Sequence, residues 1–246
     1  MIVFAQVSDF HLGGGEPNTE RAMKVMAYLN DLRQPLDAIL VTGDIADHGS
    51  PAEYEVARGI LTSTHPVFVC PGNHDVRDVY RTVLLGEAGG EVPINRVHRI
   101  PGAVFALCDS SIPGSDDGYL DDDTIRWLSE VLDSTPTDTP AFVCFHHPPV
   151  RLHNPFIDQI RQRGEHRLAA LITSHPQVVA VLCGHAHTAA ATTFAGRPLL
   201  VAPGVASTLK LPWEHGDDLD FQLPAAIAFH VLDDQRRLTT HYRVVS

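Results

Sequence analysis

The stretch that decides the fold is residues 2–11, IVFAQVSDFH, an apolar run that ends in Asp9 and His11. A short uncharged run rich in Val, Ile and Phe predicts a buried β-strand. Because side chains alternate along extended backbone, Asp9 and His11 would point to the same side of the strand. The stretch therefore predicts a strand whose carboxyl end carries two side chains of the kinds that bind metals.

The same arrangement recurs four times further along the chain. Later apolar runs are followed by GD at 43–44, GNHD at 72–75, HHP at 146–148 and GHAH at 184–187. Each motif means little alone, since Gly-Asp is commonly a turn and Gly-Asn-His-Asp a polar loop. In α/β sheets, however, ligands bind where the loops at the carboxyl ends of strands converge. Five such motifs in this order predict one polar site built from distant parts of the chain.

Helical and strand patterns alternate through the first three quarters of the sequence, and strands dominate afterwards. Strands are expected at 2–7, 37–42, 67–70, 94–100, 103–108, 141–145, 178–183, 189–194, 199–202, 226–232 and 238–244. Helices are expected at 19–32, 51–61, 77–85, 121–132 and about 165–174. This order predicts an α/β fold with two packed sheets and helices outside. No repeat or linker divides the chain, so residues 1–246 are interpreted as one domain.

Composition restricts the partners of the chain. The formal net charge of −12 repels nucleic-acid phosphates and anionic lipid, so neither nucleic acid nor membrane is an expected partner. The N-terminus lacks a basic leader and no apolar run is long enough to span a bilayer, which predicts a cytoplasmic protein. The four cysteines lie in apolar runs and are expected to be buried and reduced; they are Cys70, Cys108, Cys144 and Cys183.

The chemistry of the polar clusters favours metal-assisted hydrolysis. Carboxylate and imidazole groups suit Zn, Mn and Fe, and the clusters offer no thiolate. A carboxylate can bridge two cations about 3.5–4 Å apart, and such a pair can clamp the attacking and leaving oxygens of a phosphoester. These features indicate a hydrolase of phosphoesters.

The motifs D-x-H, G-D, G-N-H-D, H-x-P and G-H-x-H resemble those of the calcineurin-like metallophosphoesterases, over residues 9–187. The resemblance implies a four-layer αββα sandwich with two central mixed β-sheets. It also implies two metal ions per chain. One would be held by Asp9, His11, Asp44 and His187, and the other by Asp44 as the bridge with Asn73, His146 and His185.

The resemblance also assigns the residues that act on substrate. His74 and Asn73 would contact the substrate phosphate, and Asp75 would orient His74. His147 would lie behind the ligand His146. The implied mechanism is in-line attack on phosphorus by a hydroxide that bridges the metals, with His74 stabilising the transition state or protonating the leaving oxygen.

Finer features are similar to the small bacterial class III cyclic nucleotide phosphodiesterases and their glycerophosphodiesterase relatives. They are SDFHLGG at 8–14, CDSS at 108–111 and GYL at 118–120. This similarity implies a phosphodiesterase of small substrates, either 3',5'-cyclic nucleotides such as cAMP or glycerophosphodiesters. It implies Fe, Mn or Zn as the metals, and a homodimer.

Three alternatives stay open at this point. The same metals would serve a phosphomonoesterase or protein phosphatase, a nuclease is disfavoured by the acidic composition, and the complete ligand set argues against a non-enzymatic metal-binding scaffold. Residues 203–223 have no clear period. A solvated surface loop is the favoured interpretation of that segment, and a lid or rim over a site is the alternative.

Overall fold

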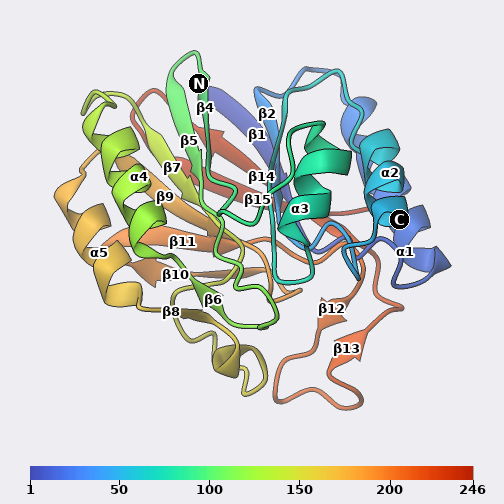
Figure 1. Cartoon of the computed structure of the whole chain (residues 1–246). Coiled ribbons are helices and arrows are strands. Elements are labelled where there is room, and N and C mark those ends of the chain that lie inside the picture. Colours follow the sequence, from blue (N-terminus) through green and yellow to red (C-terminus); the bar gives the residue numbers. More distant parts are fainter. Residues whose placement is uncertain (246) are drawn as a thin grey trace.

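The computed structural model describes residues 1–245, in which two β-sheets pack face to face (Figure 1). The first sheet has the order β15-β14-β1-β2-β3, with bounds Leu238–Val244, Ala226–Leu232, Ile2–Val7, Ala38–Thr42 and Val67–Cys70. The second has the order β10-β11-β9-β7-β5-β4, with bounds Ala190–Phe194, Arg197–Val201, Val178–Cys183, Ala141–Cys144, Ala103–Leu107 and Arg96–Ile100. Each sheet combines parallel strands with antiparallel strands at its margin, so both are mixed.

Helices cover the outer face of each sheet, as Figure 1 shows. The first sheet is covered by α1 (Glu16–Asn30) and α2 (Pro51–Ile60), and the second by α4 (Asp122–Asp133) and α5 (Glu165–Ser174). Between the sheets, the rings of Phe4, Phe105 and Phe142 pack with centroids 4.9–5.0 Å apart. The structure therefore confirms the expected four-layer αββα sandwich.

Local sequence signals explain where the helices begin. Ser50 and Glu53 form a reciprocal capping box at the start of α2, and Pro51 occupies its first turn. The Asp121 carboxylate accepts the backbone N–H of Thr124 at the start of α4. These caps set the ends of helices that lie directly over the strands.

Some expected boundaries were wrong. The first helix begins at Glu16 and not at residue 19, because Pro17 is accommodated in its first turn. The helix expected over 77–85 is α-helical only in α3 (Arg77–Val79) and continues as a π-helix over Tyr80–Leu85. Two short ribbons were not predicted: β6 (Gly118–Tyr119) with β8 (Gln162–Arg163), and β12 (Thr208–Leu209) with β13 (Leu219–Asp220). Strands of two residues are too short to show alternation.

The β12–β13 ribbon lies inside the segment 203–223, so that segment is not an irregular loop throughout. All four cysteines are free and buried, as expected. Within residues 1–245, no helix combines the length and the apolar character that a membrane span requires.

Candidate metal centre

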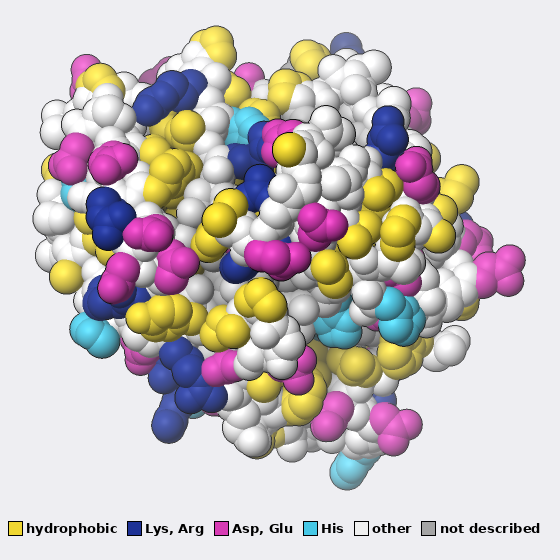
Figure 2. Space-filling model, viewed as in Figure 1, with side chains coloured by type: hydrophobic (Ala, Val, Ile, Leu, Met, Phe, Trp, Pro, Cys, Tyr) yellow, Lys and Arg dark blue, Asp and Glu magenta, His cyan; other side chains and the backbone are white. Residues whose placement is uncertain are grey.

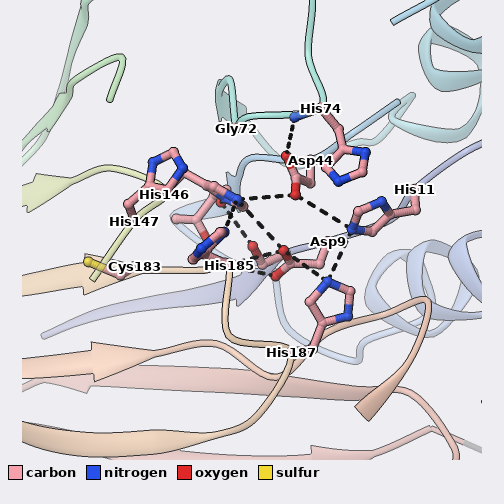
Figure 3. Close-up of polar contacts among 12 residues, drawn as sticks. Asp9, His11, Asp44, Gly72, His74, His146, His147, Cys183, His185 and His187 are labelled. Atoms are coloured by element: carbon pink, nitrogen blue, oxygen red, sulfur yellow. Dashed lines mark hydrogen bonds and ion pairs between the residues drawn. The ribbon is translucent and has the colours of Figure 1, made fainter. Parts of the chain in front are cut away.

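The five polar motifs meet where the carboxyl ends of β1, β2, β3, β7 and β9 converge (Figure 3). Backbone bonds extend the parallel pairing beyond the strands: the N–H of Asp9 donates to the Gly43 carbonyl (3.1 Å), and that of His11 to the Asp44 carbonyl (3.0 Å). A further bond joins the loops of the second sheet, from the N–H of Gly184 to the His146 carbonyl (2.9 Å). The loops that carry the motifs are therefore fixed to one another.

The first group of side chains comprises Asp9, His11 and His187, whose ligand atoms all lie within 4.8 Å of one another. His11 Nε2 lies 3.1 Å from His187 Nε2, and His187 Nε2 lies 3.5 Å from Asp9 Oδ1. Ligands that bind one cation at about 2.0–2.2 Å are separated from each other by about 3–3.6 Å. The spacing of the group fits one shared metal ion.

A second group contains Asp44, His146 and His185. His146 Nε2 lies 3.2 Å from Asp44 Oδ2 and 3.2 Å from His185 Nδ1. The same Asp44 oxygen is 3.5 Å from His11 Nε2 in the first group. One carboxylate oxygen therefore lies within reach of both groups, as a bridging ligand requires.

The side-chain amide of Asn73 is a further candidate ligand beside these two groups. Its Oδ1 is buried and, among residues 1–245, has no hydrogen-bond partner. Buried polar atoms of folded proteins are nearly always paired, so an unpaired carbonyl oxygen in a cluster of ligand residues fits a metal ion. The two groups of ligand atoms, together with this unpaired oxygen, can therefore hold two cations.

Three imidazoles are oriented by contacts made through their other ring nitrogen. Nδ1–H of His146 donates to the Thr42 carbonyl (2.7 Å), and His187 Nδ1 lies 2.8 Å from Ser207 Oγ. His11 Nδ1 lies 2.9 Å from Asp47 Oδ1. Each contact directs Nε2 toward the neighbouring ligand groups, as is typical of histidines that bind metals.

The backbone at the site is strained. Positive φ angles occur at Asp9 (58°), His11 (45°), Asp44 (49°), His185 (68°) and His187 (49°). For residues other than glycine this left-handed region costs about 1–2 kcal/mol each. Five of the seven predicted ligands adopt it, and such strain is typical of functional sites.

Charge is tightly coupled between Asp44 and His146. Burial would raise the pKa of the Asp44 carboxyl, but the charges of His146 and His11 hold it well below its ordinary value. Burial would lower the pKa of His146, but the Asp44 carboxylate raises it to about 9. The Asp44 carboxylate therefore favours a proton on His146, and a metal ion bound to that ring would displace it.

His74 lies beside the ligand groups, with 39% of its side chain exposed. Its Nδ1–H donates to the Asp47 carbonyl (2.7 Å), and its backbone N–H donates to Asp44 Oδ1 (2.9 Å). Asp47 thus contacts both His74 and His11, a role that the sequence interpretation missed. The available signal was a second aspartate three residues after Asp44 on the same loop.

The expected contact between Asp75 and His74 is wrong. Both oxygens of the buried Asp75 carboxylate accept hydrogen bonds elsewhere, from the backbone N–H groups of Ile45, Ala46 and Gly72 and from the Tyr54 hydroxyl. Burial raises the pKa of Asp75 to about 6, while these backbone bonds lower it. Asp75 therefore fixes the loops after β2 and β3 and leaves the orientation of His74 to Asp47.

His147 is fully buried, and its Nδ1 lies 2.8 Å from Ser110 Oγ. Its ring packs 4.5 Å from that of His185, centroid to centroid. Its ligand atom lies within 4.8 Å of those of His146 and His185, so it belongs to the same cluster. The sequence interpretation placed His147 behind His146 and outside the ligand set, and that assignment stays a prediction.

A cavity of about 480 Å³ opens over the site. Its polar wall contains His74 and five of the predicted ligands: His11, Asp44, Asn73, His185 and His187. Its apolar wall is formed by Phe156, Ile157, Ile160, Leu209, Leu219 and Phe221. Figure 2 shows histidine side chains next to hydrophobic ones above the β12–β13 ribbon. Residues 203–223 thus contribute to the rim of the site, which was the alternative interpretation of that segment.

Comparisons with known proteins show which family this chain is similar to. The family model described as calcineurin-like phosphoesterase matches residues 2–189. A glycerophosphodiester phosphodiesterase, GpdQ, of Enterobacter lignolyticus is 36% identical, over 88% of this chain and 81% of that protein. A cAMP/cGMP dual specificity phosphodiesterase of Mycobacterium tuberculosis is 33% identical, over 85% of this chain and 69% of that protein.

Solved structures show the same fold at low sequence identity. A dimetal phosphatase from Danio rerio superposes with a TM-score of 0.76 at 13% identity, covering 100% of this chain and 96% of that one. A purple acid phosphatase from yellow lupin superposes with a TM-score of 0.72 at 14% identity, covering 99% of this chain and 51% of that one. The fold, the order of the motifs and the extent of the family match together show that the chain belongs to the calcineurin-like phosphoesterase family.

Proposed function

We propose that this protein is a phosphodiesterase that hydrolyses small phosphodiesters with two metal ions. The observation that carries the proposal is the position of Asp44 Oδ2, 3.5 Å from His11 Nε2 in one ligand group and 3.2 Å from His146 Nε2 in the other. When bound, two such ions lower the pKa of a shared water and neutralise charge on the phosphate oxygens. The imidazole and carboxylate donors suit Fe, Mn or Zn.

The proposed ligands are those expected from the sequence. Asp9, His11, Asp44 and His187 would hold one ion, and Asp44, Asn73, His146 and His185 the other. The cluster of Asp9, His11 and His187 supports the first group. The 3.2 Å distances from His146 Nε2 to Asp44 Oδ2 and to His185 Nδ1, with the unpaired Asn73 oxygen, support the second.

His74 is proposed to act on the leaving group. Its Nδ1–H is bonded to the Asp47 carbonyl, so Nε2 is the nitrogen left for substrate. A protonated Nε2 would donate to the leaving oxygen or to a phosphate oxygen. The amide of Asn73 would help to hold the phosphate.

The charges of the cavity favour a diester over a monoester. Among the described residues that line the cavity there is no Lys or Arg, while Asp47 and Asp116 both contribute to it. A monoester dianion is commonly bound by guanidinium or ammonium groups, whereas a diester carries a single charge that two metal ions suffice to neutralise. Relatives named for glycerophosphodiesters and for cAMP and cGMP support the same conclusion. We therefore propose cyclic nucleotides or glycerophosphodiesters as substrates.

The test combines metal content with activity toward bis-p-nitrophenyl phosphate. The wild type should contain two metal ions per chain and lose activity with a chelator. The variants Asp44→Ala and His74→Ala should each lose activity, while Asp138→Ala, at an exposed turn remote from the site, should retain it. Full activity in either site variant would contradict the role assigned to that residue. A higher turnover of p-nitrophenyl phosphate than of the diester would favour the phosphomonoesterase alternative.

One domain over residues 1–246, a homodimer and a cytoplasmic location stay predictions from the sequence.

A further inference from the structure

Two phenylalanine side chains remain largely exposed at the cavity over the metal centre. Phe156 is 51% exposed and Phe221 is 56% exposed, and both line the cavity that contains His74. They come from segments far apart in the sequence, one beside a short 3-10 helix (Ile157–Gln159) and one after β13. A large apolar group left in water next to a catalytic cavity is typical of a surface that binds a ligand.

Hydrogen bonds from a second side chain fix the backbone that carries each ring. The Asn154 side chain, which is 7% exposed, accepts the N–H of Phe156 (3.0 Å) and donates to the Lys210 carbonyl (3.2 Å). Asn154 therefore ties the segment of Phe156 to the connection between β12 and β13.

Arg21 of α1 holds the other phenylalanine. Its guanidinium donates to the carbonyls of Val205 (2.6 Å), Phe221 (3.3 Å) and Leu223 (2.7 Å). Both rings thus stand on anchored backbone, which lowers the entropy lost when a ligand packs against them.

The chemistry of this wall favours a flat aromatic group. Ile157, Ile160, Leu209 and Leu219 add to the apolar lining of the same cavity. A purine or pyrimidine that packs on an aromatic side chain gains about 1–3 kcal/mol. The hydroxyls of glycerol would instead lose water against this wall without gaining a partner, which is unfavourable.

We propose that Phe156 and Phe221 determine specificity by packing against a nucleobase on the ester, so that the preferred substrates are nucleotide diesters and not glycerophosphodiesters. This inference rests on the proposed phosphodiesterase function and selects between its two substrate classes.

The experiment compares two substrates that share the reacting group. For 3',5'-cyclic AMP, Phe156→Ala and Phe221→Ala should each lower kcat/KM by about 5–150-fold, the equivalent of the stacking energy of one base. For glycerophosphoglycerol the same variants should stay within about twofold of wild type. Trp213→Ala is the matched control, because Trp213 is a 74% exposed aromatic residue of the same segment that does not line the cavity. Phe221→Tyr should retain activity on cyclic AMP.

A binding measurement separates this inference from the proposed function. Saturation-transfer NMR with adenosine and metal-stripped protein should show transfer to the base protons, and the double alanine variant should abolish it. If no diester is hydrolysed but adenosine binds through these rings, the proposed function fails and the aromatic contact stands. Equal losses on both substrates, or no loss on cyclic AMP, would overturn the inference. A preference for glycerophosphocholine that depends on Asp116 and on the two phenylalanine rings would also overturn the inference, because it would indicate that the site recognises the choline cation.

Discussion

Gly72→Ala should abolish activity although it adds a single methyl group. Gly72 follows β3, and a Cβ at this position would lie 2.2 Å from Asp44 Oδ1 and 2.5 Å from the Asp44 backbone nitrogen. Ordinary contacts of a Cβ begin at 3.4 Å, so the Asp44 carboxylate would have to move by about 1 Å or more. That carboxylate lies within reach of both ligand clusters, 3.5 Å from His11 Nε2 in one and 3.2 Å from His146 Nε2 in the other.

The size of the effect follows from the geometry that catalysis tolerates. A misplacement of about 1 Å at a reacting centre costs about 100-fold in rate, which corresponds to about 2.7 kcal/mol. Added volume in a packed interior destabilises by about 1–3 kcal/mol, so the variant should still fold. We expect Gly72→Ala to retain about 1% or less of wild-type turnover of bis-p-nitrophenyl phosphate. Elemental analysis should find fewer than two metal ions per chain.

Gly59→Ala provides the matched control. Gly59 lies in α2, and a Cβ there would meet no atom within 4 Å. The substitution should stabilise the helix by about 0.5–1 kcal/mol and leave turnover unchanged, as a urea titration and the same assay would measure. If Gly72→Ala kept more than half of the activity and two bound metals, the reasoning that places Asp44 between the metals would be refuted.

Three further predictions concern single side chains. Asp47→Ala should weaken metal binding by about 10–100-fold in a metal titration, because it removes the carboxylate that orients His11. Asp47→Asn should restore part of that affinity. Unchanged affinity in the alanine variant would refute the contact. Metal-free His187→Gly should be more stable to urea than metal-free His187→Ala by about 1 kcal/mol, because residue 187 has a φ of 49°, which glycine adopts more readily than alanine. The reverse order of stability would show that the backbone there is unstrained. Burial lowers the pKa of His230 to about 3, so the native state keeps this ring neutral while the unfolded chain is protonated below about 6.5. Stability should therefore be fully present above that pH and decline as the pH falls toward 3, and the urea midpoint of His230→Gln should vary less between pH 7 and pH 5 than that of wild type.

The positions of the strands and of the ligand residues could be predicted because both depend on local pattern. A buried strand is apolar along its length, so the first polar residues after it mark its end. Asp9, Asp44 and His185 were found in this way, and all three lie at the converging ends of strands in the structure. The parallel order of neighbouring strands then brings residues together that are far apart in the chain.

Other features depend on tertiary contacts that carry no local pattern. Asp47 and Asp75 are both acidic residues that follow a strand, and the sequence alone does not tell which of them contacts His74. The structure decides, because the carboxylate of Asp75 is surrounded by backbone N–H groups and that of Asp47 is not. Phe156 and Phe221 lie in segments without a period, and contacts such as those of Asn154 and Arg21 bring them to one cavity.

The strained backbone of the site has a consequence for how metals bind. Thr42, Asp47 and Ser207 hold the histidine rings through protein contacts alone, and bonds between loops hold the left-handed residues in place. The fold itself therefore supplies contacts that orient the ligand groups. A metal ion bound here would meet groups spaced about one coordination shell apart, and an ion bound to His146 would displace the proton that the Asp44 carboxylate favours on that ring. Because protein contacts share in ordering these side chains, more of the binding energy of the ions would be available to act on the substrate phosphate.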